Sequence, residues 1–464
     1  MGFQALTAVI FACLCFACDG FFTGNIHRNI ERQISNDVQG HKDEDKPVFQ
    51  QHWISQKLDH FNGADSRAWK QKFLVTETYY RTGGPVFLMI GGEGPINNQW
   101  MSTDSGSTWL TYAKKLGALC FLLEHRFYGD SHPTVDLRTE NLQFLSSQQA
   151  LADLAHFRTV MAKQLGLTNS KWVAFGGSYP GALAAWSRLK YPNLIHAAVA
   201  SSAPLHATVN FSEYLEVVWR ALAAENPKCP LLVKKAFDTL NELIKDPKNY
   251  ENITKDFNLC SRLQIQSEKD RAYILDSLAD SIMSTVQYNN DNRAFENHHL
   301  PPSALFQRPH LQCKPPGSQE HILQRTRQRG RQWLYQTCTE FGYFQTSDSP
   351  NQPFSGFGLQ YHVEQCLDIF NISTKTLYAG VDQTNENYGS YDIRATRIVF
   401  PNGSIDPWHA LGITSSISDD LPAIFIKGTA HCANMYPARA EDIPQLNLAR
   451  EHIFQILQKW LKEK

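Results

Sequence analysis

Ser178 lies in a glycine-rich run that could place a reactive hydroxyl group on a tight turn. The run is Gly-Gly-Ser-Tyr-Pro-Gly at 176–181, after the strand-like segment 171–175 and before the helical segment 182–191. A serine nucleophile on a sharp strand-to-helix turn needs small neighbours, because larger side chains would collide there. The usual pattern has glycine two positions after the serine; here that position is Pro180, which a first helical turn tolerates. The run predicts that Ser178 is a nucleophile; the alternative is a glycine-rich turn with an incidental serine.

A serine hydroxyl becomes reactive when a histidine accepts its proton and a carboxylate orients that histidine. Asp406 follows the strand-like segment 397–400, and His431 follows the strand-like segment 423–426. Each residue alone is more typical of a turn or a structural role, but the order Ser, Asp, His, each after its own strand, is that of α/β-hydrolases. His409 is a competing base, although it comes before the last strand. We therefore predict a catalytic triad of the serine with Asp406 and His431.

Acyl transfer by such a triad also needs backbone N–H groups that stabilise the negatively charged oxygen of the intermediate. We expect one from Tyr179, the residue after the nucleophile, and the second from the backbone of Glu93 or Gly92, in a glycine-rich loop after a strand. The Glu93 carboxylate could instead, or also, pair with a substrate amine; its structural alternative is to hold its own loop by hydrogen bonds.

The sequence predicts no metal and no cofactor. It contains no His-Glu-x-x-His motif, no pair of Cys-x-x-Cys motifs and no phosphate-binding Gly-Lys-Ser/Thr loop. The net charge is −1 and there is no long basic run, so the chain lacks the electrostatic footprint of a nucleic-acid or anionic-membrane protein. The expected partners are peptide substrates, with no nucleic acid; whether the chain forms a homodimer is left open.

Short apolar runs alternate with helical patterns on both sides of the glycine-rich turn. The strand-like runs are 85–90, 118–123, 171–175, 196–200, 397–400 and 423–426, and the helical segments are 108–116, 146–165, 182–191 and 446–461. Continuously apolar strands that alternate with helices indicate a parallel sheet covered on both faces. From about 210 to 390 the alternation stops, and the chain is polar, helical in pattern and rich in cysteine. We predict the α/β class: an α/β-hydrolase fold with a helical, disulfide-containing insertion that caps the active site.

These patterns divide the 464 residues into five segments. They are a signal peptide (1–20), a flexible leader or propeptide (21–48), the first part of the hydrolase core (49–209), the helical cap (210–392) and the second part of the core (393–464). A membrane anchor is the alternative for the N-terminal stretch, which lacks Lys and Arg at its start. We favour cleavage, because the stretch is short for a bilayer and no basic flank follows it. No integral membrane segment is expected after cleavage.

Cysteines and sequons indicate the secretory pathway, in a lysosomal, endosomal or extracellular setting. Seven of the ten cysteines follow the leader, and five of these crowd into 229–366, which is typical of disulfides in a secreted protein. The odd number leaves at least one thiol unpaired, and Cys120, inside an apolar run, is expected in the core. The glycosylation sequons begin at Asn210, Asn252, Asn371 and Asn402. The 17 histidines would make the protein cationic in an acidic compartment.

The chain resembles the serine carboxypeptidase-like family that contains lysosomal Pro-X carboxypeptidase, dipeptidyl peptidase II and thymus-specific serine peptidase. The matching segments, in chain order, are 56–61, 91–95, 124–131, the Ser178 turn, 402–409 and 428–431. The resemblance is greatest to the thymus-specific member, notably at 91–95, 178–189 and 335–342. It implies a hydrolase domain whose helical insertion roofs the active site, and cleavage near peptide termini, often after proline.

The resemblance also implies roles for residues outside the triad. By position it suggests the disulfides Cys229–Cys313 and Cys260–Cys338, and it leaves Cys366 without an obvious partner. Glu124 and Arg126 are expected in a buried structural network rather than in the chemistry.

The sequence therefore predicts a serine-type exopeptidase that works through an acyl-enzyme. An esterase or lipase on the same fold, and an inactive secreted binding protein, are the alternatives. The direction of exopeptidase cleavage stays open, because a carboxypeptidase needs a cation for the substrate carboxylate and an aminopeptidase needs an anion for the amine. Glu93 is a candidate for that anion.

Overall fold

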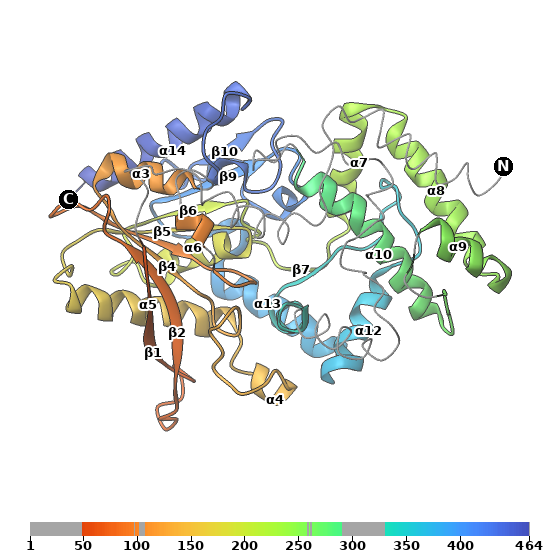
Figure 1. Cartoon of the computed structure of the whole chain (residues 1–464), viewed down its shortest axis with the longest axis horizontal. Coiled ribbons are helices and arrows are strands. Elements are labelled where there is room, and N and C mark those ends of the chain that lie inside the picture. The colour runs from red at the N-terminus through yellow and green to blue at the C-terminus, as the bar shows by residue number, and fades with distance from the viewer. Residues whose placement is uncertain are drawn as a thin grey trace, which may run out of the picture.

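A computed structural model describes residues 49–96, 98–101, 107–257, 259, 262–289 and 330–463. Its centre is an eight-stranded sheet with the order β1-β2-β4-β3-β5-β6-β9-β10 (Figure 1). The strands are β1 (Gln50–Lys57), β2 (Ala68–Thr76), β3 (Val86–Ile90), β4 (Leu119–Leu123), β5 (Trp172–Gly177), β6 (Ala197–Ser201), β9 (Ile398–Gly403) and β10 (Ala423–Ile426). β2 runs antiparallel to both its neighbours, whereas β4, β3, β5, β6, β9 and β10 are parallel to one another. This is the predicted α/β-hydrolase fold.

Helices cover both faces of the sheet, as its continuously apolar strands require. α5 (Ser147–Gln164) and α6 (Tyr179–Lys190) pack on one face, and α3 (Thr108–Leu116) and α14 (Pro444–Lys462) on the other (Figure 1). Successive residues of β3 alternate between the two cores: Val86 and Leu88 belong to the first, and Phe87 and Met89 to the second. Because the strands from β4 to β10 in the sheet order are parallel, their carboxyl ends lie at one common edge, where loops can bring distant residues together.

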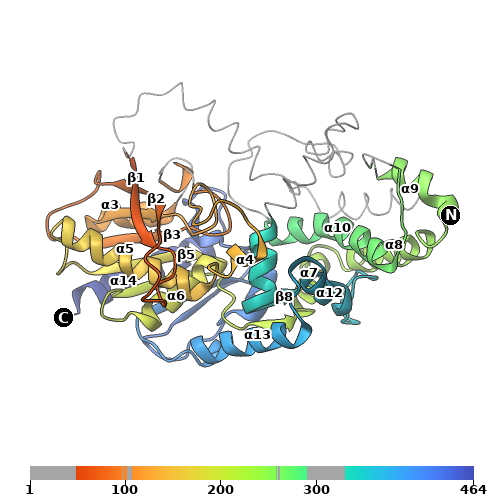
Figure 2. The same ribbon diagram turned by 90° about the horizontal axis from the view of Figure 1, so that it is seen from below.

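Between β6 and β9 the chain leaves the sheet and forms a largely helical region, which Figures 1 and 2 show beside the sheet. Its helices are α7 (Glu213–Glu225), α8 (Cys229–Leu243), α9 (Tyr250–Asp256), α10 (Glu268–Gln287), α12 (Leu359–Phe370) and α13 (Thr374–Tyr388). β7 (Thr208–Asn210) pairs in parallel with β8 (Gly342–Phe344), so the start of this region is tied to its later part. The shorter helices within the described residues are η1 (Asn98–Met101), α4 (Thr139–Leu142), η2 (Pro247–Asn249), the π-helix η5 (Thr337–Phe341), η6 (Ser390–Asp392), η7 (Pro407–Leu411) and η8 (Ala433–Met435).

The disulfide found in the described part of the chain differs from the predicted pairs. Cys338 in η5 is bonded to Cys366 in α12, with Cα atoms 5.5 Å apart. The predicted Cys260–Cys338 bond is therefore wrong, because η5 and α12 bring Cys338 to a different partner, and Cys366 does have one. The other suggested pair, Cys229–Cys313, is not described, since Cys313 and Cys260 lie outside the described residues. Cys120 is a buried core thiol, as predicted.

The four sequons differ in the exposure of their asparagines. Asn252 and Asn371 are exposed, and Asn210 is half-buried, with its side-chain nitrogen 3.2 Å from Oδ2 of Asp348. Asn402 is buried and donates to the carbonyl of Ile413 at 2.9 Å, which leaves no room for a glycan. The predicted signal peptide and leader lie outside the described residues. Within the described ranges, none of the helices has both the length and the apolar character that crossing a bilayer requires.

Candidate active site

Ser178 occupies a strained turn between β5 and α6. Its φ of 65° and ψ of −134° lie in a region that residues other than glycine rarely adopt. The glycines around it are required by close packing. A Cβ atom at Gly176 would lie 2.0 Å from the carbonyl oxygen of Pro180, and one at Gly181 would lie 2.7 Å from that of Ser201. The structure thus contains the sharp strand-to-helix turn that the glycine-rich run predicted.

Asp406 and His431 lie together on the loops that follow β9 and β10. Nδ1 of His431 donates to Oδ1 of Asp406 at 2.9 Å, and both side chains are buried. The same oxygen accepts the backbone N–H of Trp408 at 3.0 Å, where Asp406 caps η7. The competing base, His409, instead places its Nδ1 2.7 Å from the backbone oxygen of Asp406. The structure therefore pairs His431 with the carboxylate, and His409 with a backbone carbonyl.

The surroundings of His431 favour its protonated form. Burial by itself lowers the pKa of the imidazole, but the Asp406 carboxylate and the neighbouring Cys432 raise it. The resulting pKa of His431 lies well above the ordinary value of 6.5. The pair is thus suited to stabilise the imidazolium that forms when a histidine takes a proton from a serine.

Ser201, the last residue of β6, and Ser202, the next residue, connect the serine turn to the loop after β10. The backbone N–H of Ser178 donates to the carbonyl of Ser201 at 2.9 Å. The Ser201 hydroxyl accepts a hydrogen bond from Nδ2 of Asn434 at 2.9 Å. The Ser202 hydroxyl accepts one from the backbone N–H of Cys432, also at 2.9 Å. The loops that carry the three predicted triad residues therefore meet at one edge of the sheet.

Tyr179, the expected oxyanion donor, is the first residue of α6. Its backbone N–H has no carbonyl of the same helix to bond, and it lies at the positive end of the helix dipole. Its side chain is held firmly. The Tyr179 hydroxyl accepts from Nε2 of Gln336 at 3.0 Å and lies 3.0 Å from Nε2 of His125. The other ring nitrogen of His125 donates to the carbonyl of Arg126 at 2.7 Å, so Nε2 must accept from Tyr179.

Glu93 lies in the loop after β3, with an exposed side chain. This loop adjoins the serine turn, since a Cβ atom at Gly92 would lie 2.6 Å from Cγ of Pro180. Although the side chain is open to solvent, desolvation by the surrounding protein raises the pKa of Glu93 to about 7, against the lowering effects of its own backbone N–H and of His431.

The buried network predicted for Glu124 and Arg126 is present. Glu124 accepts hydrogen bonds from the backbone N–H of Ile96 at 3.1 Å and from the hydroxyl of Ser131 at 2.7 Å. Arg126 donates to both carboxylate oxygens of Asp153, at 2.6 and 2.7 Å. The contact with Ile96 fixes the end of the loop that carries Glu93.

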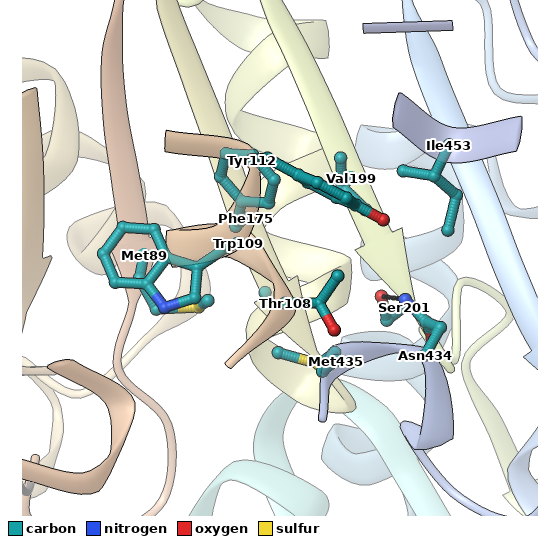
Figure 3. Close-up of a pocket in the computed structure, with 11 residues that line it drawn as sticks. Met89, Thr108, Trp109, Tyr112, Phe175, Val199, Ser201, Asn434, Met435 and Ile453 are labelled. Atoms are coloured by element: carbon teal, nitrogen blue, oxygen red, sulfur yellow. Dashed lines mark hydrogen bonds between the residues drawn. The ribbon is translucent and has the colours of Figure 1, made fainter. Parts of the chain in front are cut away.

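A small cavity lies beside the serine turn, on the face of the sheet covered by α3 and α14 (Figure 3). Its volume is about 20 Å³, and Gly176 and Met435 are among the residues that line it. Ser201 and Asn434 lie side by side in its wall. Ligand pockets have volumes of about 300–1,000 Å³, so this cavity has room for a single water molecule and is not the substrate site.

Two insertion residues outside the predicted site residues, Gln287 and Gln336, also contact the predicted site. Gln336 donates to Tyr179, as described above, and its Oε1 accepts the hydroxyl of Tyr128 at 2.7 Å. The carbonyl oxygen of Gln287 accepts the backbone N–H of His431 at 2.9 Å. Gln287 belongs to no motif, and Gln336 lies in the 335–342 segment that carries the family resemblance, but neither segment predicted a contact with the site.

Comparison with known proteins agrees with the resemblance drawn from the motifs. Residues 56–303 and 312–453 match the family described as serine carboxypeptidase S28. A putative serine protease of Caenorhabditis elegans is 37% identical over 447 residues, which cover 88% of this chain and 87% of the relative. The thymus-specific serine protease of Mus musculus is 36% identical over 459 residues, which cover 90% and 88% of the two chains.

A more distant relative is the lysosomal Pro-X carboxypeptidase of Bos taurus, which is 27% identical over 448 residues, covering 89% of this chain and 88% of the relative. The family match extends over most of the chain and includes the Ser178 turn and the loops of Asp406 and His431. The chain therefore belongs to the serine carboxypeptidase S28 family and is a serine peptidase.

Proposed function

We propose that this peptidase is an exopeptidase that cleaves peptides through Ser178, His431 and Asp406. The observation that carries the proposal is the buried hydrogen bond between His431 and Asp406, on loops that are joined to the strained Ser178 turn. The predicted order of the three residues along the chain supports the same assignment.

In the proposed mechanism, Ser178 attacks the peptide carbonyl while His431 takes the proton of its hydroxyl. Asp406 keeps the imidazole oriented and stabilises its positive charge. His431 then gives the proton to the leaving amine, and an acyl-enzyme remains on the serine. Water, activated by the same histidine, releases the acyl group and restores the enzyme.

Backbone N–H groups stabilise the negatively charged oxygen of the tetrahedral intermediates in this mechanism. We assign one donor to Tyr179, because its N–H lies free of intrahelical bonds at the start of α6. The second comes from the loop of Gly92 and Glu93, which packs against the turn through Gly92 and Pro180.

We propose that the substrates are short peptides or peptide ends with proline near the cleaved bond, since a related enzyme is named for Pro-X cleavage. Residues 210–392 form the cap under which these peptides bind. Glu93 supplies an exposed carboxylate beside His431, and we assign it to the free amine of the substrate. This makes the amino terminus of the peptide the end that the enzyme recognises.

We also propose that the chain works in the secretory pathway, in lysosomes or outside the cell. The exposed sequons at Asn252 and Asn371 and the Cys338–Cys366 disulfide support an oxidising, glycosylating route.

A fluorophosphonate probe tests the catalytic assignment, because it reacts with activated serines whatever the substrate. Wild-type protein should be labelled, and Ser178→Ala should not be. Equal labelling of both, or none of the wild type, would refute the assignment. A peptide library with both ends free, then with each end blocked in turn, identifies the recognised end. We expect acetylation of the amino terminus to abolish cleavage and amidation of the carboxyl terminus to leave it intact.

A further inference from the structure

Gln287 connects the helical insertion to both loops of the acid–base pair. It is the last residue of α10, and its carbonyl oxygen accepts the backbone N–H of His431 at 2.9 Å. Its side-chain oxygen Oε1 accepts two further hydrogen bonds, from the hydroxyl of Tyr214 at 2.7 Å and from Nε1 of Trp408 at 3.0 Å. Gln287 therefore bonds both the backbone of His431 and the indole of Trp408, two positions after Asp406.

The side chains that donate to Oε1 of Gln287 are buried, and an unpaired buried donor costs free energy of folding. Tyr214 and Trp408 are 2% and 8% exposed, so removal of Oε1 would leave two buried donors without their acceptor. Their rings pack edge to face, with centroids 5.9 Å apart. The ring of Tyr288, the residue after Gln287, lies 5.9 Å from that of His431, also edge to face. The end of α10 therefore packs directly against the base of the proposed triad.

The backbone of Trp408 links this contact to the acid. Its N–H donates to Oδ1 of Asp406, the same oxygen that accepts Nδ1 of His431. A displacement of Trp408 would therefore move the hydrogen bond that orients the imidazole. Small errors in such geometry matter, since a misplacement of about 1 Å can reduce a rate by about 10²-fold.

We propose that Gln287 is a positioning residue that keeps the Asp406 and His431 loops aligned, so that the insertion takes part in catalysis through the geometry of the triad. The inference rests on the proposed roles of Ser178, His431 and Asp406. Gln287 touches no reacting atom in this scheme. It acts through the His431 backbone and through Trp408.

The test uses the rate of fluorophosphonate labelling as a function of pH, which needs no knowledge of the substrate. Two quantities are read: the plateau rate and the acid midpoint, the pH at which the rate falls to half of the plateau. The ionisable groups around His431 are Asp406, Cys432, Glu93 and Tyr288, and the variants leave all of them in place.

Gln287→Met keeps the length of the side chain but removes the acceptor. We expect the plateau rate to fall about 10- to 100-fold. The acid midpoint should move to lower pH, because a looser contact with Asp406 no longer raises the pKa of His431 as strongly. Gln287→Glu restores an acceptor for both donors. Its plateau should stay within about threefold of wild type, and its midpoint should move to higher pH because a negative charge is added near the histidine.

Gln352→Met is the matched control. Gln352 is a buried glutamine of the same insertion, and among the described residues its side chain bonds the backbone of its own loop, at Ser347, Ser349 and Phe354. The control should lower the melting temperature without changing the plateau or the midpoint. The proposal fails if Gln287→Met behaves in the same way.

Tyr214→Phe decides the matter if Gln287→Met does not fold, because it removes only one of the two donors to Oε1. We expect a plateau about two- to fivefold lower and a midpoint shifted in the same direction. An unchanged profile in a folded Tyr214→Phe protein would overturn the proposal. Absence of labelling in the wild type would instead refute the proposed function, so the two failures are distinguishable.

Discussion

The sulfur atom of Met435 lies against Gly177, so closely that a Cβ atom at position 177 would be 2.3 Å from Sδ. On the other side of the same turn, a Cβ atom at Gly176 would be 2.0 Å from the carbonyl oxygen of Pro180. Distances under 3.0 Å are essentially never found for real Cβ atoms. Glycine is therefore required at position 176, where the neighbour is backbone, whereas at position 177 the neighbour is the end of a flexible side chain that could move.

Gly176→Ala should disrupt the turn, because the atom that it meets belongs to the backbone and cannot rotate away. We expect a loss of about 3 kcal/mol or more in the free energy of unfolding and no labelling by fluorophosphonate. Chemical denaturation and the labelling assay measure the two effects. Gly63→Ala is the control, since nothing lies within 4 Å of its added Cβ atom, and it should change neither quantity. Full labelling of Gly176→Ala would contradict the packing described here.

Because the pKa of His431 is raised, activity should increase with pH, whereas the contribution of His431 to stability should decrease. A general base must be neutral, so kcat/KM should rise with pH through a value well above 6.5. The contact with Asp406 favours the protonated form in the folded state. Its contribution to stability is therefore fully present below the unfolded pKa of about 6.5 and is lost as pH rises through the folded pKa. A pH–rate profile and denaturation at several pH values check both signs.

Asp406→Asn removes the negative charge of the side chain but keeps its size and shape. The amide oxygen can still accept from both Trp408 and His431, as Oδ1 of the carboxylate does, but it carries no negative charge to stabilise the imidazolium. We expect kcat to fall by about 10⁴-fold, with the acid side of the profile shifted to lower pH because the negative charge is gone. A protein with nearly normal kcat would show that Asp406 is not the acid of the triad.

Glu93→Gln should weaken binding of peptides with a free amino terminus. We expect KM for these peptides to rise about tenfold or more, since a charged hydrogen bond is worth about 1.5–3 kcal/mol. N-acetylated peptides should be cleaved equally poorly by both proteins. With the pKa of Glu93 raised to about 7, wild-type KM for free-amine peptides should improve as pH rises through that value, and this dependence should vanish in the variant. An equal effect on both peptide classes would assign Glu93 to the oxyanion loop alone.

The Cys338–Cys366 bond closes a loop with a sequence separation of 28 residues. The entropy of such a loop corresponds to about 3.5 kcal/mol of stability, so the double substitution to Ala should lower the free energy of unfolding by up to that amount. Peptide mapping without reduction should recover the two cysteines in one linked pair of peptides. A peptide that links Cys260 to Cys338 would contradict the pairing described here.

Most of the sheet could be predicted from the sequence, because its parallel strands are short, continuously apolar runs. β1 and β2 could not. They contain many polar and charged residues, such as Lys70 and Lys72, and they lack the continuous apolar pattern of the parallel strands. The order of Ser178, Asp406 and His431 was equally readable, since each follows a predicted strand.

Contacts made by the insertion could not be predicted in the same way. A disulfide depends on which helices meet, so five clustered cysteines allowed several pairings and the chosen one for Cys338 was wrong. Gln287 lies more than 100 residues before Trp408 and His431, which it contacts, and a glutamine at the end of a helix carries no distinctive pattern. Only the path of the chain in space brings it to them.

The strand order also determines when, during translation, the sheet around the serine turn can be completed. β6, next to the strand that leads to Ser178, ends at Ser201, and its other neighbour in the sheet, β9, begins at Ile398, about 200 residues later. At about 5–20 residues per second, those residues take about 10–40 s to make. Throughout that time the nascent chain carries Ser178 but neither Asp406 nor His431, so under the proposed mechanism it could not hydrolyse peptides until the whole insertion had been synthesised.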